Sequence, residues 1–186
     1  MTSDGYAQQY GSGLCGMTAI LNGLRVLFGE DAITEKIAGH LQVAMARALV
    51  GTGATDLPGV LFEDGTGRDQ LKRMLRAARA WTDEAGWLPW RWDGVHPIKG
   101  TTASRFWMEL SLAMQGRRAT LVVGFGSDTL RGTDYEPHWT CVEAIGAANL
   151  DLRDGAGYGY VPISDTGVRP EPRWAVQDAF LLSQGS

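Results

Sequence analysis

The sequence is poor in cysteine and has no long apolar run. Of its 186 residues only two are cysteines, Cys15 and Cys141. A reducing cytosol disfavours a disulfide between them, so we expect two thiols, with Cys141 a small buried apolar residue. No apolar run approaches the ~20 residues of a membrane-spanning helix, and the N-terminal residues lack the basic and apolar regions of a signal peptide. We therefore expect a cytoplasmic protein without a membrane partner, with secretion through another signal left open.

Clustered positive charge and metal-binding motifs are also missing. The net charge is −4, and the longest basic runs are the pairs Lys72-Arg73 and Arg117-Arg118, so the sequence has no electrostatic signature of nucleic-acid binding. It contains no Cys-x-x-Cys and no His-Glu-x-x-His motif, which leaves zinc without ligands at usable spacing. We expect no nucleic-acid partner, no metal and no cofactor.

Apolar periodicity predicts helices in the first part of the chain and strands in the last part. Residues 15–28, 31–49, a stretch that begins near Thr66, and 103–115 have helical spacing. Short strands are expected at Ala119–Phe125, Trp139–Ile145, Leu150–Arg153, Tyr158–Val161 and Ala175–Leu182. Residues 81–99, rich in tryptophan, glycine and proline, indicate an aromatic loop or short strands. This order favours one α+β domain over residues 1–186, with a helical lobe to about 116 and a sheet lobe from about 117.

Cys15 is the first candidate for chemistry. A glycine-rich approach, Gly11-Ser12-Gly13-Leu14, leads to Cys15 in the first turn of the predicted helix. A helix N-terminus offers free N–H groups and a positive dipole end, and both favour thiolate. Gln9, six residues upstream and favoured over Gln8, is placed to donate its amide to an oxyanion beside that sulfur. The alternative is a structural cysteine at the start of a core helix.

His138 and Asp154 are the candidate partners of that thiol. His138 opens an apolar strand and is a candidate general base and acid. Asp154 follows the next strand, where its carboxylate would accept the imidazole N–H. Because side chains alternate along a strand, a His138 that faces Cys15 leaves Cys141 facing away. Alternatives left open are His40 and His96 as the base, and Asp151 and Asn149 as the third member.

These residues belong to three segments that occur in a fixed order. The segments are Gln9 with Leu14–Ile20, the run Phe106–Leu110 with Gln115–Val123, and His138–Gly146 with Leu150–Gly155. Together they resemble the papain-like cysteine peptidases, and within them the bacterial group that includes the leader peptidases of peptide exporters. Gly155 differs from that group, in which proline usually follows the acid. Residues 30–100 match no motif of the family.

The resemblance implies a thiol hydrolase. Cys15, His138 and Asp154 would form the triad and Gln9 the oxyanion donor, cleaving a peptide or isopeptide bond through a thioester. It also implies a helical lobe that carries the cysteine helix, packed on an antiparallel sheet lobe, and a peptide or protein substrate. An aromatic loop between two lobes would border the cleft between them, so Trp90 and Trp92 are candidate substrate contacts. Trp139 is a third candidate, placed to shield the ion pair from water.

Other functions remain compatible with the same residues. An amidase, a deamidase or an acyltransferase, including an effector toxin, would use the same triad with a different acyl acceptor. A catalytically inactive module that binds an extended peptide in a tryptophan-lined groove is a further alternative. The reactivity of the Cys15 thiol distinguishes that module from an enzyme. The sequence leaves the substrate and the oligomeric state undetermined.

Overall fold

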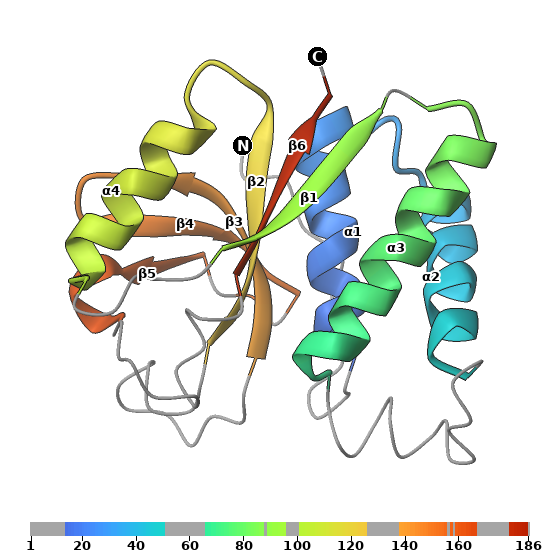
Figure 1. The fold of residues 1–186 in the computed structure, drawn as a ribbon, viewed down its shortest axis with the longest axis horizontal. Coiled ribbons are helices and arrows are strands. Elements are labelled where there is room, and N and C mark those ends of the chain that lie inside the picture. The colour runs from blue at the N-terminus through green and yellow to red at the C-terminus, as the bar shows by residue number, and fades with distance from the viewer. Residues whose placement is uncertain are drawn as a thin grey trace.

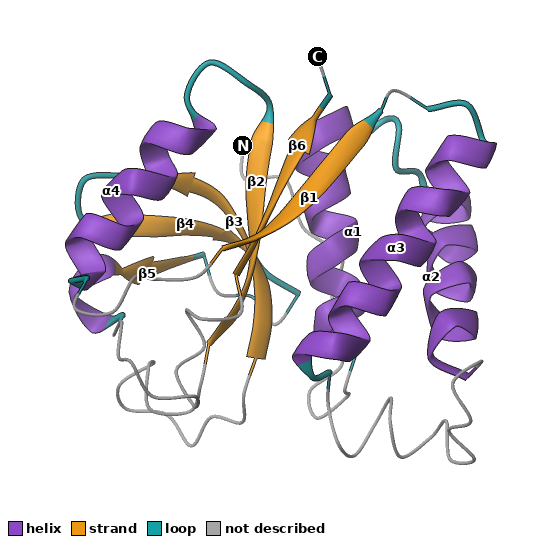
Figure 2. Cartoon of the chain, in the orientation of Figure 1, coloured by secondary structure: helices purple, strands orange, loops and turns teal. Residues whose placement is uncertain are grey.

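The structure, a computed structural model, describes residues 14–50, 66–87, 89–95, 101–125, 138–155, 157, 159–166 and 179–185. Within these ranges the chain forms four α-helices and one six-stranded antiparallel sheet (Figure 1 and Figure 2), so the predicted α+β class is confirmed. The helices are α1 (Cys15–Phe28), α2 (Glu35–Val50), α3 (Arg68–Glu84) and α4 (Ala103–Met114). The strands are β1 (Trp90–Val95), β2 (Ala119–Phe125), β3 (His138–Ile145), β4 (Asn149–Arg153), β5 (Tyr160–Pro162) and β6 (Ala179–Gln184), and the 3₁₀ helix η2 (Ile163–Asp165) follows β5.

The sheet does not follow the order of the sequence. Its strands lie in the order β1-β6-β2-β3-β4-β5, and every neighbouring pair is antiparallel. The last strand, β6, is therefore inserted between β1 and β2. All residues of β2 are buried, because helices cover both faces of the sheet. A strand buried on both faces has a continuous apolar sequence, which β2 shows.

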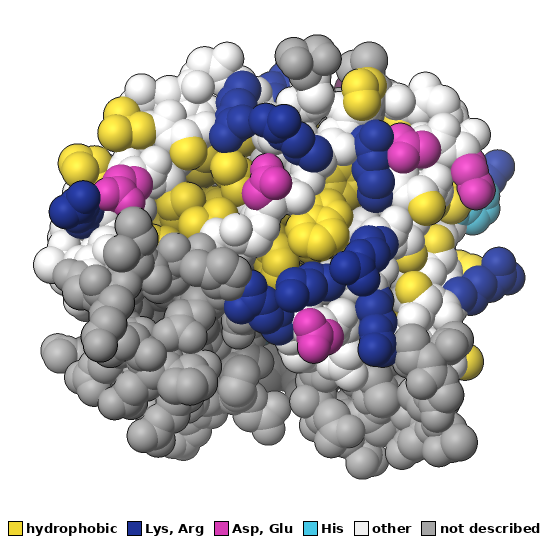
Figure 3. All heavy atoms as spheres, viewed as in Figure 1, with side chains coloured by type: hydrophobic (Ala, Val, Ile, Leu, Met, Phe, Trp, Pro, Cys, Tyr) yellow, Lys and Arg dark blue, Asp and Glu magenta, His cyan; other side chains and the backbone are white. Residues whose placement is uncertain are grey.

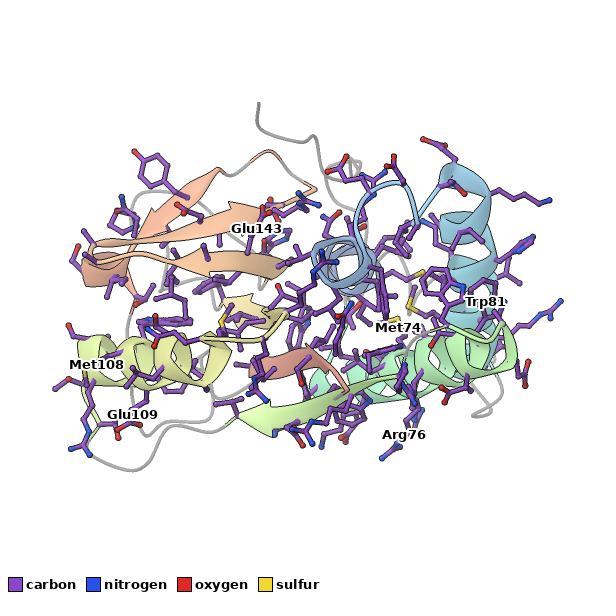
Figure 4. All side chains as sticks on the ribbon, turned by 90° about the horizontal axis from the view of Figure 1, so that it is seen from above. Met74, Arg76, Trp81, Met108, Glu109 and Glu143 are labelled. Atoms are coloured by element: carbon purple, nitrogen blue, oxygen red, sulfur yellow. The ribbon has the colours of Figure 1, made fainter. Side chains whose placement is uncertain are left out.

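Helices pack on both faces of the sheet. α1 packs across β2 and β3, with α2 and α3 outside it, whereas α4 lies on the opposite face (Figure 1 and Figure 4). Met74 of α3 is fully buried among the three helices, while Met108 of α4 points outward and is 56% exposed (Figure 4). Two apolar clusters result, one between α1–α3 and the sheet and one between α4 and the sheet.

The outer face of α3 is basic. On the face shown in Figure 3, Lys and Arg side chains gather over α3 and the neighbouring β1. Lys72 pairs with Asp69 at 3.5 Å, and Arg79 pairs with Asp83 at 2.8 Å. The buried residues of α3 are Leu71, Met74, Leu75, Ala78 and Thr82. Exposed ion pairs contribute little each, so burial of this apolar face is what fixes α3 against the rest of the molecule.

The main elements lie at or near their predicted positions, but the predicted lobes do not. α1 and β2 have the predicted bounds, and α2 begins at Glu35 because residues 30–33 form a turn and a bend. The division into a helical lobe ending near residue 116 and a sheet lobe beyond it is wrong. β1 is an edge strand of the sheet, and the apolar face of α4 covers the sheet opposite α1. No helix in the described ranges is long and apolar enough to cross a membrane.

Candidate active site

Cys15 lies at the start of α1, as predicted. It is the first residue of the helix and is 5% exposed. Leu14 occupies the N-cap position, and within the described residues no side chain caps the first turn. The Cys15 sulfur therefore sits beside backbone N–H groups that have no partner within the helix, at the positive end of the helix dipole. These are surroundings that stabilise negative charge on sulfur.

Gly16 allows another segment to approach this end of the helix closely. A Cβ atom at Gly16 would lie 2.6 Å from Cγ2 of Thr66 and 3.0 Å from Cδ1 of Leu71. The carbonyl of Thr66 in turn accepts a hydrogen bond from Nε1 of Trp139. Thr66 thus lies between the helix that carries Cys15 and the strand that carries His138. The glycine after the cysteine has a packing reason, and sequence reasoning missed the part that Thr66 plays.

His138 and Asp154 form a short hydrogen bond. His138 is the first residue of β3, and its Nε2 lies 2.6 Å from Oδ1 of Asp154, which directly follows β4. The side chains of His138 and Asp154 are 12% and 1% exposed. Because Nε2 is engaged by the carboxylate, Nδ1 is the ring nitrogen that is left for Cys15, with which His138 also forms a hydrogen bond.

The surroundings of His138 favour its charged form. Burial is the largest influence and lowers the pKa of His138. The hydrogen bonds to Asp154 and Cys15 and the charges of those two groups together outweigh it, raising the pKa from 6.5 to about 9. At neutral pH the ring is then an imidazolium, which donates from both nitrogens and needs an acceptor on each side. Asp154 and Cys15 are the two partners that act on the ring.

The sequence matches no known protein-family model and no curated protein. The interpretation of the site therefore rests on the contacts among Cys15, His138 and Asp154. A thiolate beside an imidazolium that a carboxylate orients is a nucleophile with an adjacent acid and base. Among the described residues no three His, Cys, Asp or Glu side chains gather closely enough to hold a metal ion.

The alternative third members and the alternative bases lie elsewhere. Asn149 and Asp151 are exposed on β4, and neither contacts His138 in the described part of the chain, whereas Asp154 does. His40 is exposed on α2, where its ring lies 6.1 Å from that of Trp81. Gln9, Gln8 and His96 lie outside the described residues.

Cys141 is a buried thiol on the same face of the sheet as α1. It is paired in register with Val122, which belongs to the cluster beneath α1, and its sulfur lies 3.1 Å from Oγ1 of Thr120. The prediction that Cys141 would face away from the Cys15 side is wrong. His138 belongs to the other face by alternation, and it acts with Cys15 from the first position of β3, where it pairs with Phe125 at the end of the ladder. Burial raises the pKa of the Cys141 thiol to about 12, so this thiol stays protonated and unreactive.

The three tryptophans predicted to contact substrate differ in what they expose. Trp90 is 2% exposed, and its Nε1 donates to Oγ1 of Thr82 near the C-terminal end of α3, away from Cys15. Trp139 is 6% exposed, and its ring lies against Gly124, where a Cβ would come within 3.3 Å. Trp92 is half-buried, with its ring 5.7 Å from that of Phe180. Trp90 and Trp139 are core residues, and Trp92 alone of the three offers surface to a ligand.

Proposed function

We propose that the protein is a papain-like cysteine hydrolase that cleaves a peptide or isopeptide bond. The observation that carries this proposal is that His138 has Asp154 at 2.6 Å from its Nε2 and Cys15 as a further partner that acts on its charge. The three residues come from the start of a helix, the start of a strand and the end of the next strand. A merely structural histidine has no need of a thiol at a helix N-terminus as its second partner.

The reaction follows from these positions. The sulfur of Cys15 attacks the carbonyl carbon of the amide and forms a C–S bond, while His138 gives its proton to the leaving nitrogen as the C–N bond breaks. A thioester and a free amine result. Water then attacks the thioester carbon and gives a proton to His138, and the C–S bond breaks to release a carboxylic acid and the thiolate. The Cys15 backbone N–H, with Gln9 as the predicted second donor, would stabilise the oxyanion.

The bond class is tested with a mixed peptide substrate. Wild-type protein and Cys15→Ala are incubated with a proteome-derived peptide mixture, and new peptide termini are identified by mass spectrometry. New termini that arise with wild type and with Cys141→Ala, but not with Cys15→Ala, support the proposal. The Cys141 variant is the matched control because it removes a buried thiol that has no part in the reaction. Equal sets of termini from wild type and Cys15→Ala would count against hydrolysis and favour a peptide-binding module.

A further inference from the structure

Asn22 is a buried polar residue on the apolar side of α1. Its side chain is fully buried, and its Nδ2 donates a hydrogen bond of 3.1 Å to the backbone carbonyl of Arg153, 131 residues later in the chain. A buried amide is costly unless it is hydrogen-bonded. The hydrogen bond from Asn22 to this carbonyl therefore offsets the cost of burying the amide and ties α1 to the end of β4.

The position of Asn22 relates it to both ends of the candidate site. It follows Cys15 by seven residues, close to two full helical turns, so the two side chains lie on nearly the same face of α1, about 10 Å apart along the axis. The carbonyl that it binds belongs to the peptide bond between Arg153 and Asp154. One helix thus presents the nucleophile at its start and binds, two turns later, the peptide that precedes the acid.

Arg153 is held by its side chain as well. Its Nη2 lies 3.3 Å from a carboxylate oxygen of Glu143 in β3 and 3.3 Å from one of Glu30, just after α1, and Arg153 is 7% exposed. These ion pairs hold the Arg153 side chain at the end of β4. The orientation of the Arg153–Asp154 peptide plane depends instead on the hydrogen bonds of that peptide, including the one from Asn22. That plane determines the direction in which the Asp154 side chain leaves the backbone.

We infer that Asn22 is a positioning residue for catalysis: by fixing the Arg153–Asp154 peptide against α1, it aims the Asp154 carboxylate at His138. This inference rests on the proposed function, because it assigns Asn22 a part in the same site. Asn22 acts through Asp154, by way of the backbone carbonyl of Arg153. The ionisable groups that act on His138 are Asp154 and Cys15, and Arg153, Glu143 and Asp154 lie around the neighbouring Cys141.

The test uses the full chain and two readouts that need no substrate. The first is the pKa of the His138 imidazole by NMR, with His40 as an internal reference, and the second is the rate of Cys15 alkylation by iodoacetamide at pH 6. Asn22→Leu removes the donor at similar volume, and Asn22→Ser is the milder variant if the leucine variant does not fold. Ile20→Val is the matched control, a change at another fully buried position of α1. Asp154→Ala, alone and combined with Asn22→Ser, completes a double-mutant cycle.

The inference expects the Asn22 variants to lower the pKa of His138 by about one unit and to slow Cys15 alkylation by about tenfold. Ile20→Val leaves both unchanged, and in the Asp154→Ala background Asn22→Ser changes the rate by less than about twofold, because its effect is transmitted through Asp154. A wild-type pKa in the Asn22 variants, an equal shift in Ile20→Val, or additive effects in the cycle would overturn the inference while leaving the proposed function standing. A pKa of His138 that Asp154→Ala does not alter would overturn both.

Discussion

His138 interacts with both Asp154 and Cys15, and this is the feature on which the candidate site depends. Asp154 engages Nε2 from a side chain that is 1% exposed, so water competes little for the carboxylate. Cys15 is the other partner. A histidine that interacts with both a thiol and a carboxylate is placed to carry protons as general acid and base.

Asp154→Asn is the direct test at this scale. The amide keeps the shape of the side chain but removes the charge that raises the pKa of His138, while burial, which lowers it, stays. We expect the pKa of His138 to fall from about 9 by about one to three units, so that the imidazolium is lost at a lower pH. A histidine NMR titration measures this. An unchanged pKa would show that the 2.6 Å contact does not govern the charge of the ring.

The candidate triad could be predicted from sequence, whereas its supporting residues could not. Cys15, His138 and Asp154 each lie where a predicted element begins or ends, and they follow one another in the order cysteine, histidine, carboxylate that the resembled family shows. Thr66 and Asn22 act through hydrogen bonds to distant parts of the chain, and no local sequence pattern reveals such bonds. The one signal available for Asn22 was a polar residue within the apolar pattern of residues 15–28.

At the scale of elements, α1 is fixed at its start by the close approach of the segment that leads into α3. That approach depends on the missing side chain at Gly16. For residues 81–99 the sequence left a loop or short strands open, because the tryptophans lie among glycine and proline, and the pairing of β1 with β6 decides for a strand. The basic outer face of α3 was not predicted, because its cations are spread along the helix and only Lys72 and Arg73 are adjacent in the sequence.

Gly16→Ala tests the contact at the start of α1. The added methyl would lie 2.6 Å from Cγ2 of Thr66, so the helix start and Thr66 must separate, and we expect a loss of about 1–3 kcal/mol of unfolding free energy in urea with slower Cys15 alkylation. Gly39→Ala in α2 is the matched control, because no atom lies within 4 Å of its added Cβ. It should be neutral or stabilising by up to ~1 kcal/mol. Equal behaviour of the two variants would contradict the packing argument.

At the level of the whole molecule, the sheet separates two apolar clusters, and the candidate nucleophile belongs to the one beneath α1. Cys15 and Trp139 are members of that cluster, whereas Phe106, Trp107 and Leu110 of α4 pack on the other face. The site therefore depends on the arrangement of α1, the start of α3 and the start of β3. The packing of α4 on the sheet therefore stabilises the fold, but it does not position the Cys15 side chain.

Leu110→Ala separates these two contributions. Leu110 is 5% exposed in the cluster under α4, and removing its side chain should cost about 2–5 kcal/mol of unfolding free energy. In the folded state Cys15 should react with iodoacetamide at the wild-type rate, because no contact of the triad changes. Urea unfolding and thiol labelling of the same preparation measure both. A large fall in labelling of the folded variant would show that α4 takes part in shaping the site.

We expect Cys15 and His138 to form an ion pair at neutral pH, and the rate at which iodoacetamide alkylates Cys15 from pH 4 to 9 measures whether they do. Peptide mass mapping follows wild type, His138→Ala and the exposed-histidine control His40→Ala, with Cys141 as an internal unreactive thiol. An ordinary thiol, with a pKa near 8.5, reacts slowly at pH 6. We predict rapid labelling of Cys15 at pH 6 in wild type and in His40→Ala, and no labelling of Cys141. In His138→Ala we expect Cys15 to be labelled as slowly as an ordinary thiol. The difference in Cys15 labelling rate between wild type and His138→Ala should vanish toward pH 9, where a free thiol ionises and His138 loses its proton. Slow labelling at pH 6 that does not depend on His138 would contradict the account.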